Sequence, residues 1–349
     1  MVDLDALPAG ADGRTVWRAL GQAGLITELF DPGPGPRLDL LDVLLTELDR
    51  RLGVGTVLSI CVQLATALPI LRGALPGTDT AAKVTDAATR GETVLALAVT
   101  DAAAAGSDLM ALGTTARLDG DRVTVDGGKT WITNARTADY ALVLARHRPQ
   151  RHFTSFLWVL VPTDAPGVLA EPAGTGLFAG SGVGHLRFDG VTLGRDHLIG
   201  SPGRGLPTFA RHVGTERAAG ALWARAICRR VLAGTQRRLA DRGLWTNDAV
   251  RDRFARCLVE LRRMDAMCAQ HAAAGPDALL SSMLLKASTA QSLDLVLAEC
   301  VQLLGAEAFG SGGVAELRAE AAMFGIAGGA SGAMLAGIAE HATDLVGAP

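Results

Sequence analysis

The sequence has no excess of basic residues and few aromatic ones. Its 33 lysines and arginines face 36 aspartates and glutamates, aromatic residues make up 4% of the chain, and no polybasic block is present. Proteins that bind nucleic acid concentrate such cations, because each phosphate contact needs a neutralising charge. We therefore expect no nucleic-acid partner.

Signals for membranes and export are also scarce. No apolar stretch stands out as the ~18 uninterrupted residues of a membrane-spanning helix. The first fifteen residues, MVDLDALPAGADGRT, are acidic and lack the positive start and apolar centre of a signal peptide. The sequence thus predicts a cytoplasmic protein with no membrane partner.

Cysteine and histidine spacings that would indicate a metal site are missing. The five cysteines are scattered singly, with no Cys-x-x-Cys pair, and the seven histidines form no pair at helical metal spacing. His212 lies one helical turn before Glu216, and we expect a surface or core histidine or a group that modulates that glutamate. We expect no metal, and buried reduced thiols rather than disulfides.

Helical patterns flank a stretch of short strands. With 349 residues, of which 49% are hydrophobic, the chain suits two or three packed units. We expect an α+β fold with an N-terminal helical domain (1–91), a middle β-domain (92–203) and a C-terminal helical bundle (204–349). Alternation predicts strands over 95–99, 114–118, 122–125, 140–145, 153–161, 185–188 and 191–193. Helical spacing predicts long bundle helices over 206–240, 248–273, 276–305 and 314–346.

Two motifs lie within residues 95–146. Thr100-Asp101 is followed by Ala105-Gly106-Ser107-Asp108, and Gly128-Lys129-Thr130-Trp131-Ile132-Thr133-Asn134 comes about twenty residues later. On composition alone, this is an ordinary β-meander with a buried tryptophan. The motifs, however, resemble the flavin-binding middle domain of acyl-CoA dehydrogenases, with Asp101 in place of the usual glutamate and the usual proline missing.

The resemblance implies an architecture and a reaction. The family has a helical N-terminal domain, a β-barrel-like middle domain and a C-terminal four-helix bundle. Its members bind FAD and oxidise the Cα–Cβ bond of an acyl thioester. A carboxylate removes the α-proton and the β-hydrogen leaves as hydride to flavin N5, so that one well-placed glutamate is required.

The position of that glutamate is unusual in this chain. Where most relatives have it, near the C-terminus, the matching residue is Gly328, with Gly329 retained and Ala330 in place of a threonine. A minority branch carries the base on an earlier helix just before an arginine, and Glu216-Arg217 matches that segment. The resemblance implies Glu216 as the base. Two other roles are open for it, an ion pair or a place in the first turn of a helix.

The cofactor contacts also follow from the resemblance, residue by residue. In the middle domain they are Val99, Thr100, Gly106, Ser107, Trp131 and Thr133. A neighbouring subunit contributes Arg242 and Trp245 to the flavin and Gln302 and Gly305 to the adenine half, and Gly329 completes the set. Because one FAD then contacts two chains, we expect a homodimer or homotetramer, or a hetero-oligomer with a paralogue.

Three functions fit these features. The first is FAD-dependent dehydrogenation of an acyl thioester on CoA or an acyl carrier protein, in a specialised biosynthetic pathway. Its electron acceptor would be an electron-transfer flavoprotein or O₂. The second is a flavin-dependent oxygenase on the same scaffold, consistent with the missing C-terminal glutamate. The third is a non-catalytic subunit that pairs with an active paralogue.

Overall fold

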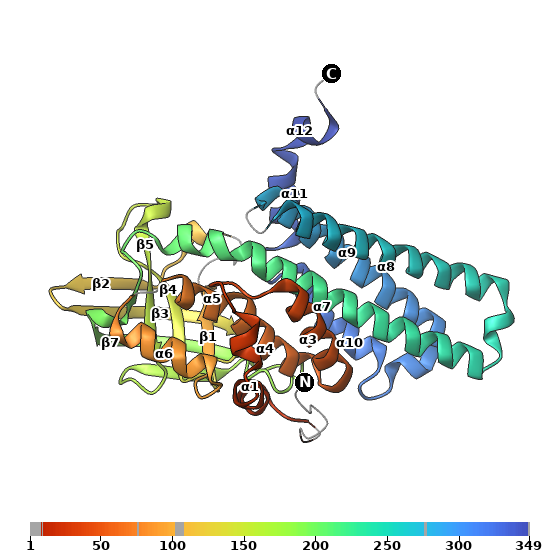
Figure 1. Ribbon diagram of the computed structural model, residues 1–349, viewed down its shortest axis with the longest axis horizontal. Helices are drawn as coiled ribbons and strands as arrows, with labels where there is room; N and C mark the ends of the chain where they lie inside the picture. The colour runs from red at the N-terminus through yellow and green to blue at the C-terminus, as the bar shows by residue number, and fades with distance from the viewer. Residues whose placement is uncertain (1–7, 9, 75–76, 102–107, 276–277, 348–349) are drawn as a thin grey trace. The chain divides into compact units, whose positions relative to one another are not determined.

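The computed structural model describes residues 8, 10–74, 77–101, 108–275 and 278–347. Within them the chain divides into two compact units (Figure 1). The first comprises residues 1–41 and 55–215, and the second comprises residues 42–54 and 216–349. The α+β class is confirmed, whereas the three-domain division stays a prediction.

Short helices form much of the first unit. They are α1 (Gly13–Gln22), α2 (Leu25–Leu29), α4 (Val54–Val62), the π-helical turn η2 (Gln63–Ala67), α5 (Leu68–Gly73) and α6 (Asp79–Thr89). The Asp12 carboxylate accepts a bond from the Thr15 amide at 2.9 Å and so caps α1. The π turn precedes Pro69, which has no N–H with which to continue the helical ladder.

One segment of the chain is apolar enough to resemble a membrane span. The continuous helical segment Val54–Gly73 has the length and hydropathy of a membrane span, with a mean hydropathy of 2.0, and 89% of this window is buried in the folded chain. It is the one such segment in the described part of the chain. Burial on nearly all faces explains its composition, because a core helix needs no polar side.

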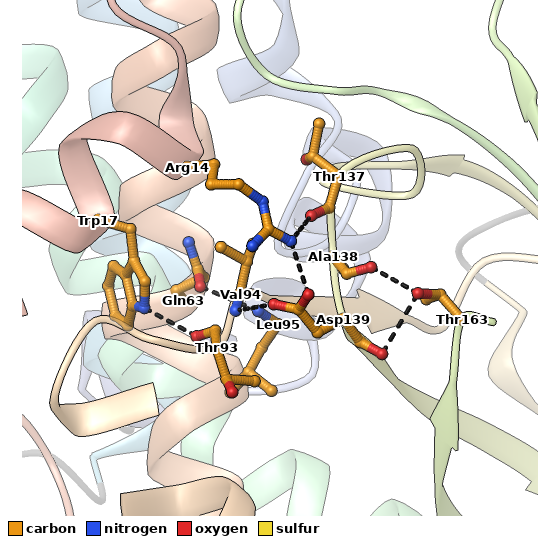
Figure 2. A network of polar contacts seen from close by, with 10 residues as sticks. All are labelled: Arg14, Trp17, Gln63, Thr93, Val94, Leu95, Thr137, Ala138, Asp139 and Thr163. Atoms are coloured by element: carbon orange, nitrogen blue, oxygen red, sulfur yellow. Dashed lines mark hydrogen bonds and ion pairs between the residues drawn. The ribbon is translucent and has the colours of Figure 1, made fainter. Parts of the chain in front are cut away.

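A polar network joins the N-terminal helices to the first strand (Figure 2). Asp139 accepts bonds from Arg14 Nη2 and from the Val94 amide, both at 2.8 Å. Gln63 Oε1 accepts the Leu95 amide at 3.0 Å. These bonds satisfy the backbone where the chain enters the sheet, and they hold that entry against the helices.

The strands form one mixed sheet. They are β1 (Leu95–Ala98), β2 (Thr115–Asp119), β3 (Arg122–Ile132), β4 (Tyr140–Arg146), β5 (Phe156–Pro162), β6 (Val168–Pro172), β7 (Gly184–Gly194) and β8 (Leu198–Ile199). Their order is β6-β7-β3-β2-β4-β5-β8, and β1 pairs in parallel with β4. A strand lies at each predicted position, but residues 153–155 form a 3₁₀ turn instead. The predicted strands 185–188 and 191–193 are one strand, β7, and the predicted strand 122–125 continues to Ile132. Strand β6 was missed because its residues are mostly exposed and show no apolar alternation. Three short 3₁₀ turns, η3 (Leu109–Ala111), η4 (Phe153–Ser155) and η5 (Arg195–His197), lie between the strands.

Long helices dominate the second unit. They are α7 (Gly205–Asp241, the part from Glu216 onward), α8 (Asp248–Ala274) and α9 (Leu279–Leu304). The turn η6 (Leu244–Thr246) lies between α7 and α8, and the turn η7 (Gly305–Phe309) follows α9. Figure 1 shows α8 and α9 running side by side. Most of helix α3 (Leu38–Arg51) belongs to this unit as well. There Asp49 binds Arg230 at 2.7 Å and the Trp223 indole at 3.3 Å.

The last predicted helix, 314–346, is wrong as a single element. The chain instead forms α10 (Val314–Ala321), the turn η8 (Ala322–Gly325), α11 (Ser331–Ala339) and α12 (Ala342–Val346). Gly328 and Gly329 have φ values of +69° and +106°, which a right-handed helix cannot contain. The break therefore follows from the two adjacent glycines, and it creates a loop at residues 326–330.

The cysteines behave as predicted. All five are buried and none forms a disulfide.

Candidate active site

The end of β1 lies beside the second motif. Thr100, half-buried, accepts a backbone bond from Thr130 at 2.9 Å, and Asp101 pairs with Lys129 in an isolated antiparallel bridge. Val99 is buried, 9% exposed. The structure therefore brings together the two stretches that the sequence motifs singled out, although they are thirty residues apart.

A buried ion pair holds this junction. The Lys129 ammonium donates to the Asp101 carboxylate and, at 2.8 Å, to the Val99 carbonyl, and both side chains are almost fully buried. Asp101 also accepts the Thr114 amide at 2.7 Å. Burial lowers the pKa of Lys129 to about 8, although the Asp101 charge opposes the shift. Asp101, although one methylene shorter than the usual glutamate, thus still reaches the lysine. The pair fixes the backbone on either side of Thr100.

Trp131 stands on a bulge of β3. The pairing of β3 with β7 shifts register between Lys129 and Ile132, and Trp131 adopts a left-handed φ of 56°. Its indole is 57% exposed, which contradicts the alternative of an ordinary β-meander with a buried tryptophan. The Trp131 amide donates to His185 Nδ1 at 3.3 Å, and the two rings meet edge to face at 6.0 Å. A strained backbone that holds a large aromatic outward is typical of a ligand site.

Three further predicted contacts belong to this unit. Thr133 is half-buried and immediately precedes Asn134, whose side chain donates to the Leu95 carbonyl at 2.9 Å and so links β3 to β1. Gly106 and Ser107, the predicted pyrophosphate contacts, lie outside the described residues.

In the second unit, Glu216 and Gly328 are neighbours. A Cβ built on Gly328 would stand 3.5 Å from Glu216 Oε1 and 3.6 Å from its carboxyl carbon. The Glu216 carboxylate, half-buried, thus lies against the position from which most relatives extend their base. In the sequence these two residues are 112 positions apart, and only the family resemblance connected them.

Two buried cations border this pair. Arg217 donates to the Gly328 carbonyl at 3.1 Å and to Ser282 Oγ at 2.9 Å. Lys286 donates to the Phe324 carbonyl, and its Cε would lie 3.8 Å from the same built Cβ. Sequence reasoning missed Lys286. Its signal was a single charged residue in the apolar run Met283-Leu284-Leu285-Lys286-Ala287, where a buried lysine needs a specific partner.

The pKa of Lys286 is lowered to about 8. Burial is the main cause, the Glu216 charge opposes the shift, and Arg217 adds to it. Burial also lowers the pKa of Arg217, again against the field of Glu216. The carboxylate is therefore the negative charge that compensates both cations.

The residues predicted to act on a neighbouring subunit's cofactor gather at one end of the helices. Arg242 Nη1 donates to the Leu304 carbonyl at 3.3 Å, which ties the end of α7 to the end of α9 beside Gln302 and Gly305. Both of these are exposed, and Gly305 has a φ of +65°. Trp245 packs edge to face on Phe254 at 5.1 Å. Gly329, by contrast, lies in the loop 326–330, where a built Cβ would be 3.6 Å from Arg217 Nη2.

His212, on the first-unit part of α7, is a buried residue, 7% exposed. Its Nε2 has no hydrogen-bond partner among the described residues and would lie 3.1 Å from a Cβ built on Gly73. Burial, followed by the charge of Arg211, lowers the pKa of this imidazole. A surface position is therefore excluded, and the ring fits because residue 73 has no side chain.

The sequence matches two domain models of one family. Residues 96–191 match the acyl-CoA dehydrogenase middle domain and residues 203–343 match the acyl-CoA dehydrogenase C-terminal domain. The chain belongs to the acyl-CoA dehydrogenase family.

Individual relatives share parts of the chain. Acyl-CoA dehydrogenase IpdE1 of Mycobacterium tuberculosis is 34% identical over 158 residues, which are 43% of this chain and 39% of that protein. The chain thus aligns with only about two fifths of this relative. Acyl-[acyl-carrier-protein] dehydrogenase MbtN of a Mycobacterium species is 26% identical over 83% of this chain and 75% of its own. The structure of a Mycobacterium smegmatis glutaryl-CoA dehydrogenase in complex with FADH2 superposes with a TM-score of 0.84. It is 20% identical over 96% of this chain and 88% of that one.

The described residues fit a flavin. An isoalloxazine ring needs a flat apolar surface and polar groups along its edge. The exposed Trp131 indole supplies the first, and the adjacent Thr133 and Thr100, both half-buried, supply the second. Since members of this family depend on FAD, these residues would hold its ring system.

Proposed function

We propose that this chain catalyses FAD-dependent α,β-dehydrogenation of an acyl thioester, with Glu216 as the base for the α-proton. The observation that supports the proposal best is the position of the Glu216 carboxylate, 3.5 Å from a Cβ built on Gly328. The carboxylate of Glu216, carried on the earlier helix α7, thus lies close to residue 328, where the resemblance implies that most relatives carry their glutamate.

Each group of residues has a distinct proposed task. Glu216 takes the α-proton onto a carboxylate oxygen, while Arg217 fixes the loop at Gly328 by its bond to the carbonyl. Trp131, Thr133 and Thr100 would hold the flavin, which when bound would supply the acceptor for the β-hydrogen of the substrate. A half-buried carboxylate suits the task, because a base must be ionised and yet face an apolar chain.

The substrate carrier and the assembly are parts of the same proposal. The likeness to MbtN over 83% of the chain supports an acyl carrier protein as carrier, with CoA as the alternative, and a biosynthetic role. Arg242, Trp245, Gln302 and Gly305 at one end of the helices support a homodimer or homotetramer in which they contact the FAD of a neighbouring copy. The electron acceptor is an electron-transfer flavoprotein or O₂, and the place of action is the cytoplasm.

Substituting the base tests the function. The FAD-loaded protein is assayed with saturated acyl thioesters on CoA and on an acyl carrier protein, with a dye as electron acceptor and mass detection of the enoyl product. We expect Glu216→Gln to lower kcat by about 10²–10⁴-fold, the usual contribution of a general base. The matched control is Glu340→Gln, an exposed glutamate of the same unit, which should leave kcat unchanged.

The proposal fails if Glu216→Gln, folded and carrying FAD, turns over the thioester at the wild-type rate. It also fails if neither carrier supports enoyl formation by the wild-type protein. Product hydroxylation coupled to oxidation of reduced flavin would instead support the oxygenase.

A further inference from the structure

Lysine is rare in this chain, and Lys286 is one of its unusual positions. The sequence holds three lysines, Lys83, Lys129 and Lys286. Lys129 is explained by its ion pair with Asp101. Lys286 lies in the first third of α9, 7% exposed. Placing an ammonium in such surroundings is costly unless a specific group compensates it, so its partners indicate its role.

Lys286 and Glu216 flank the same empty face of Gly328. The lysine Cε and the glutamate Oε1 lie 3.8 Å and 3.5 Å from the Cβ that Gly328 lacks. The two atoms are therefore separated by no more than the sum of these distances. A side chain at residue 328 would begin close to both of them, and its absence leaves the lysine stem and the carboxylate near one point.

The same lysine holds the loop that carries Gly328. Its Nζ donates to the Phe324 carbonyl in the turn η8, just before the loop 326–330. Arg217 holds the loop from the other side through the Gly328 carbonyl. The charged groups whose fields reach Lys286 are Glu216 and Arg217, both on α7. Lys286 thus combines a backbone contact with a charge that interacts with the proposed base.

We propose that Lys286 is a positioning residue for Glu216: its ammonium anchors the Phe324 carbonyl and keeps the facing carboxylate ionised. The inference rests on the proposed function of Glu216 as base. A cation at this distance favours the charged form of a carboxylate, so that the base stays ready to take a proton even though it is half-buried. Lys286 itself takes no part in proton transfer.

The pH profile of the FAD-loaded enzyme tests this role. An opposite charge within a few ångströms lowers a carboxylate pKa by about 1–3 units. We therefore expect Lys286→Met to shift the acidic limb of kcat/KM upward by about one unit or more, which is about tenfold lower activity on that limb. Lys286→Arg, which keeps the charge, should retain the wild-type limb. A purely structural lysine would change the rate but not the position of the limb.

A second measurement needs no activity. With only three lysines, ¹³Cε labelling resolves each one, and Lys286→Arg assigns the Lys286 signal. We expect the titration midpoint of Lys286 to fall in Glu216→Gln, because the carboxylate that favours the ammonium is removed. This measurement remains decisive if Lys286→Met does not fold.

The outcomes separate the two proposals. If Glu216→Gln is fully active, the proposed function fails. If Glu216→Gln is inactive, but the acidic limb of Lys286→Met and the Lys286 midpoint in Glu216→Gln both stay at wild-type values, only the role of Lys286 is overturned.

Discussion

The carboxylate of Glu216 lies against the side-chain-free Cα of Gly328, 3.5 Å from the point where a Cβ would stand. Glu216 is carried by helix α7 and Gly328 by the loop before α11. The glutamate that the resemblance implies at residue 328 is missing, and Glu216 lies beside that position. This relationship leads directly to a first prediction.

Returning a glutamate to residue 328 should rescue the loss of Glu216. In the Glu216→Gln background, we expect Gly328→Glu to recover at least about tenfold of the lost kcat, a minor share of what a general base contributes. The φ of +69° at residue 328 costs about 1–2 kcal/mol for a residue with a side chain, so the variant should also unfold at lower urea.

The matched control for the rescue is Gly328→Gln in the same background, which adds the same bulk without a carboxylate. A folded, FAD-loaded Glu216→Gln/Gly328→Glu protein that is as inactive as this control would contradict the prediction.

The buried pair of Lys129 and Asp101 should show strong coupling. We expect Lys129→Met to lower the free energy of unfolding by about 3–5 kcal/mol, because Asp101 then keeps its charge in the core without its cation. Adding Asp101→Asn should restore part of the loss. Urea unfolding of the two single variants and the double variant gives the coupling energy, and strictly additive losses would show that the pair contributes nothing.

Stability should respond to pH through the same lysine. The folded-state pKa of Lys129, about 8, lies below the ordinary lysine value of 10.5, so between these values the unfolded chain binds more protons. The free energy of unfolding of the wild type should therefore rise relative to Lys129→Met as the pH increases from about 8 to 10.5. The difference between the two proteins removes the opposing effect of buried thiols such as Cys228, whose pKa burial raises. A difference that stays flat or falls over this interval would refute the prediction.

Trp131 should report flavin binding by fluorescence. Its indole is 57% exposed, whereas Trp17, Trp158 and Trp223 are buried. We expect FAD added to the apoprotein to quench tryptophan emission. Trp131→Phe should lose part of that quenching while still binding flavin, because an aromatic surface remains, and the half-buried Trp245 should contribute the rest. Equal quenching in both proteins would place the flavin away from this residue.

Arg242 should matter for FAD retention but not for folding. Its guanidinium is exposed at the end of α7, where it binds the Leu304 carbonyl at 3.3 Å. We expect Arg242→Gln to reduce the FAD content of the purified protein severalfold with little change in Tm, since exposed polar contacts add little stability. The control is Arg237→Gln, an exposed arginine of the same helix. Equal FAD content in all three proteins would exclude Arg242 from the cofactor site.

Much of the architecture could be read from local patterns. The strands from Leu95 to Arg146 and the helices α7, α8 and α9 follow from alternation and helical spacing, which depend only on neighbouring residues. The prediction of strands and helices from apolar patterns failed at two places. Strand β6 is mostly exposed, and the segment 314–346 looks helical although Gly328 and Gly329 adopt φ values that end a helix.

The sequence by itself determined the family motifs, the loss of the usual glutamate at Gly328 and the candidate Glu216. Only the tertiary structure decided that these two residues touch, that Lys286 faces them and that Trp131 is exposed rather than buried. The physical reason is that motifs record the order of residues along the chain. Contact between residues 216, 286 and 328 depends instead on how separate helices pack and on a loop whose backbone only glycine adopts easily.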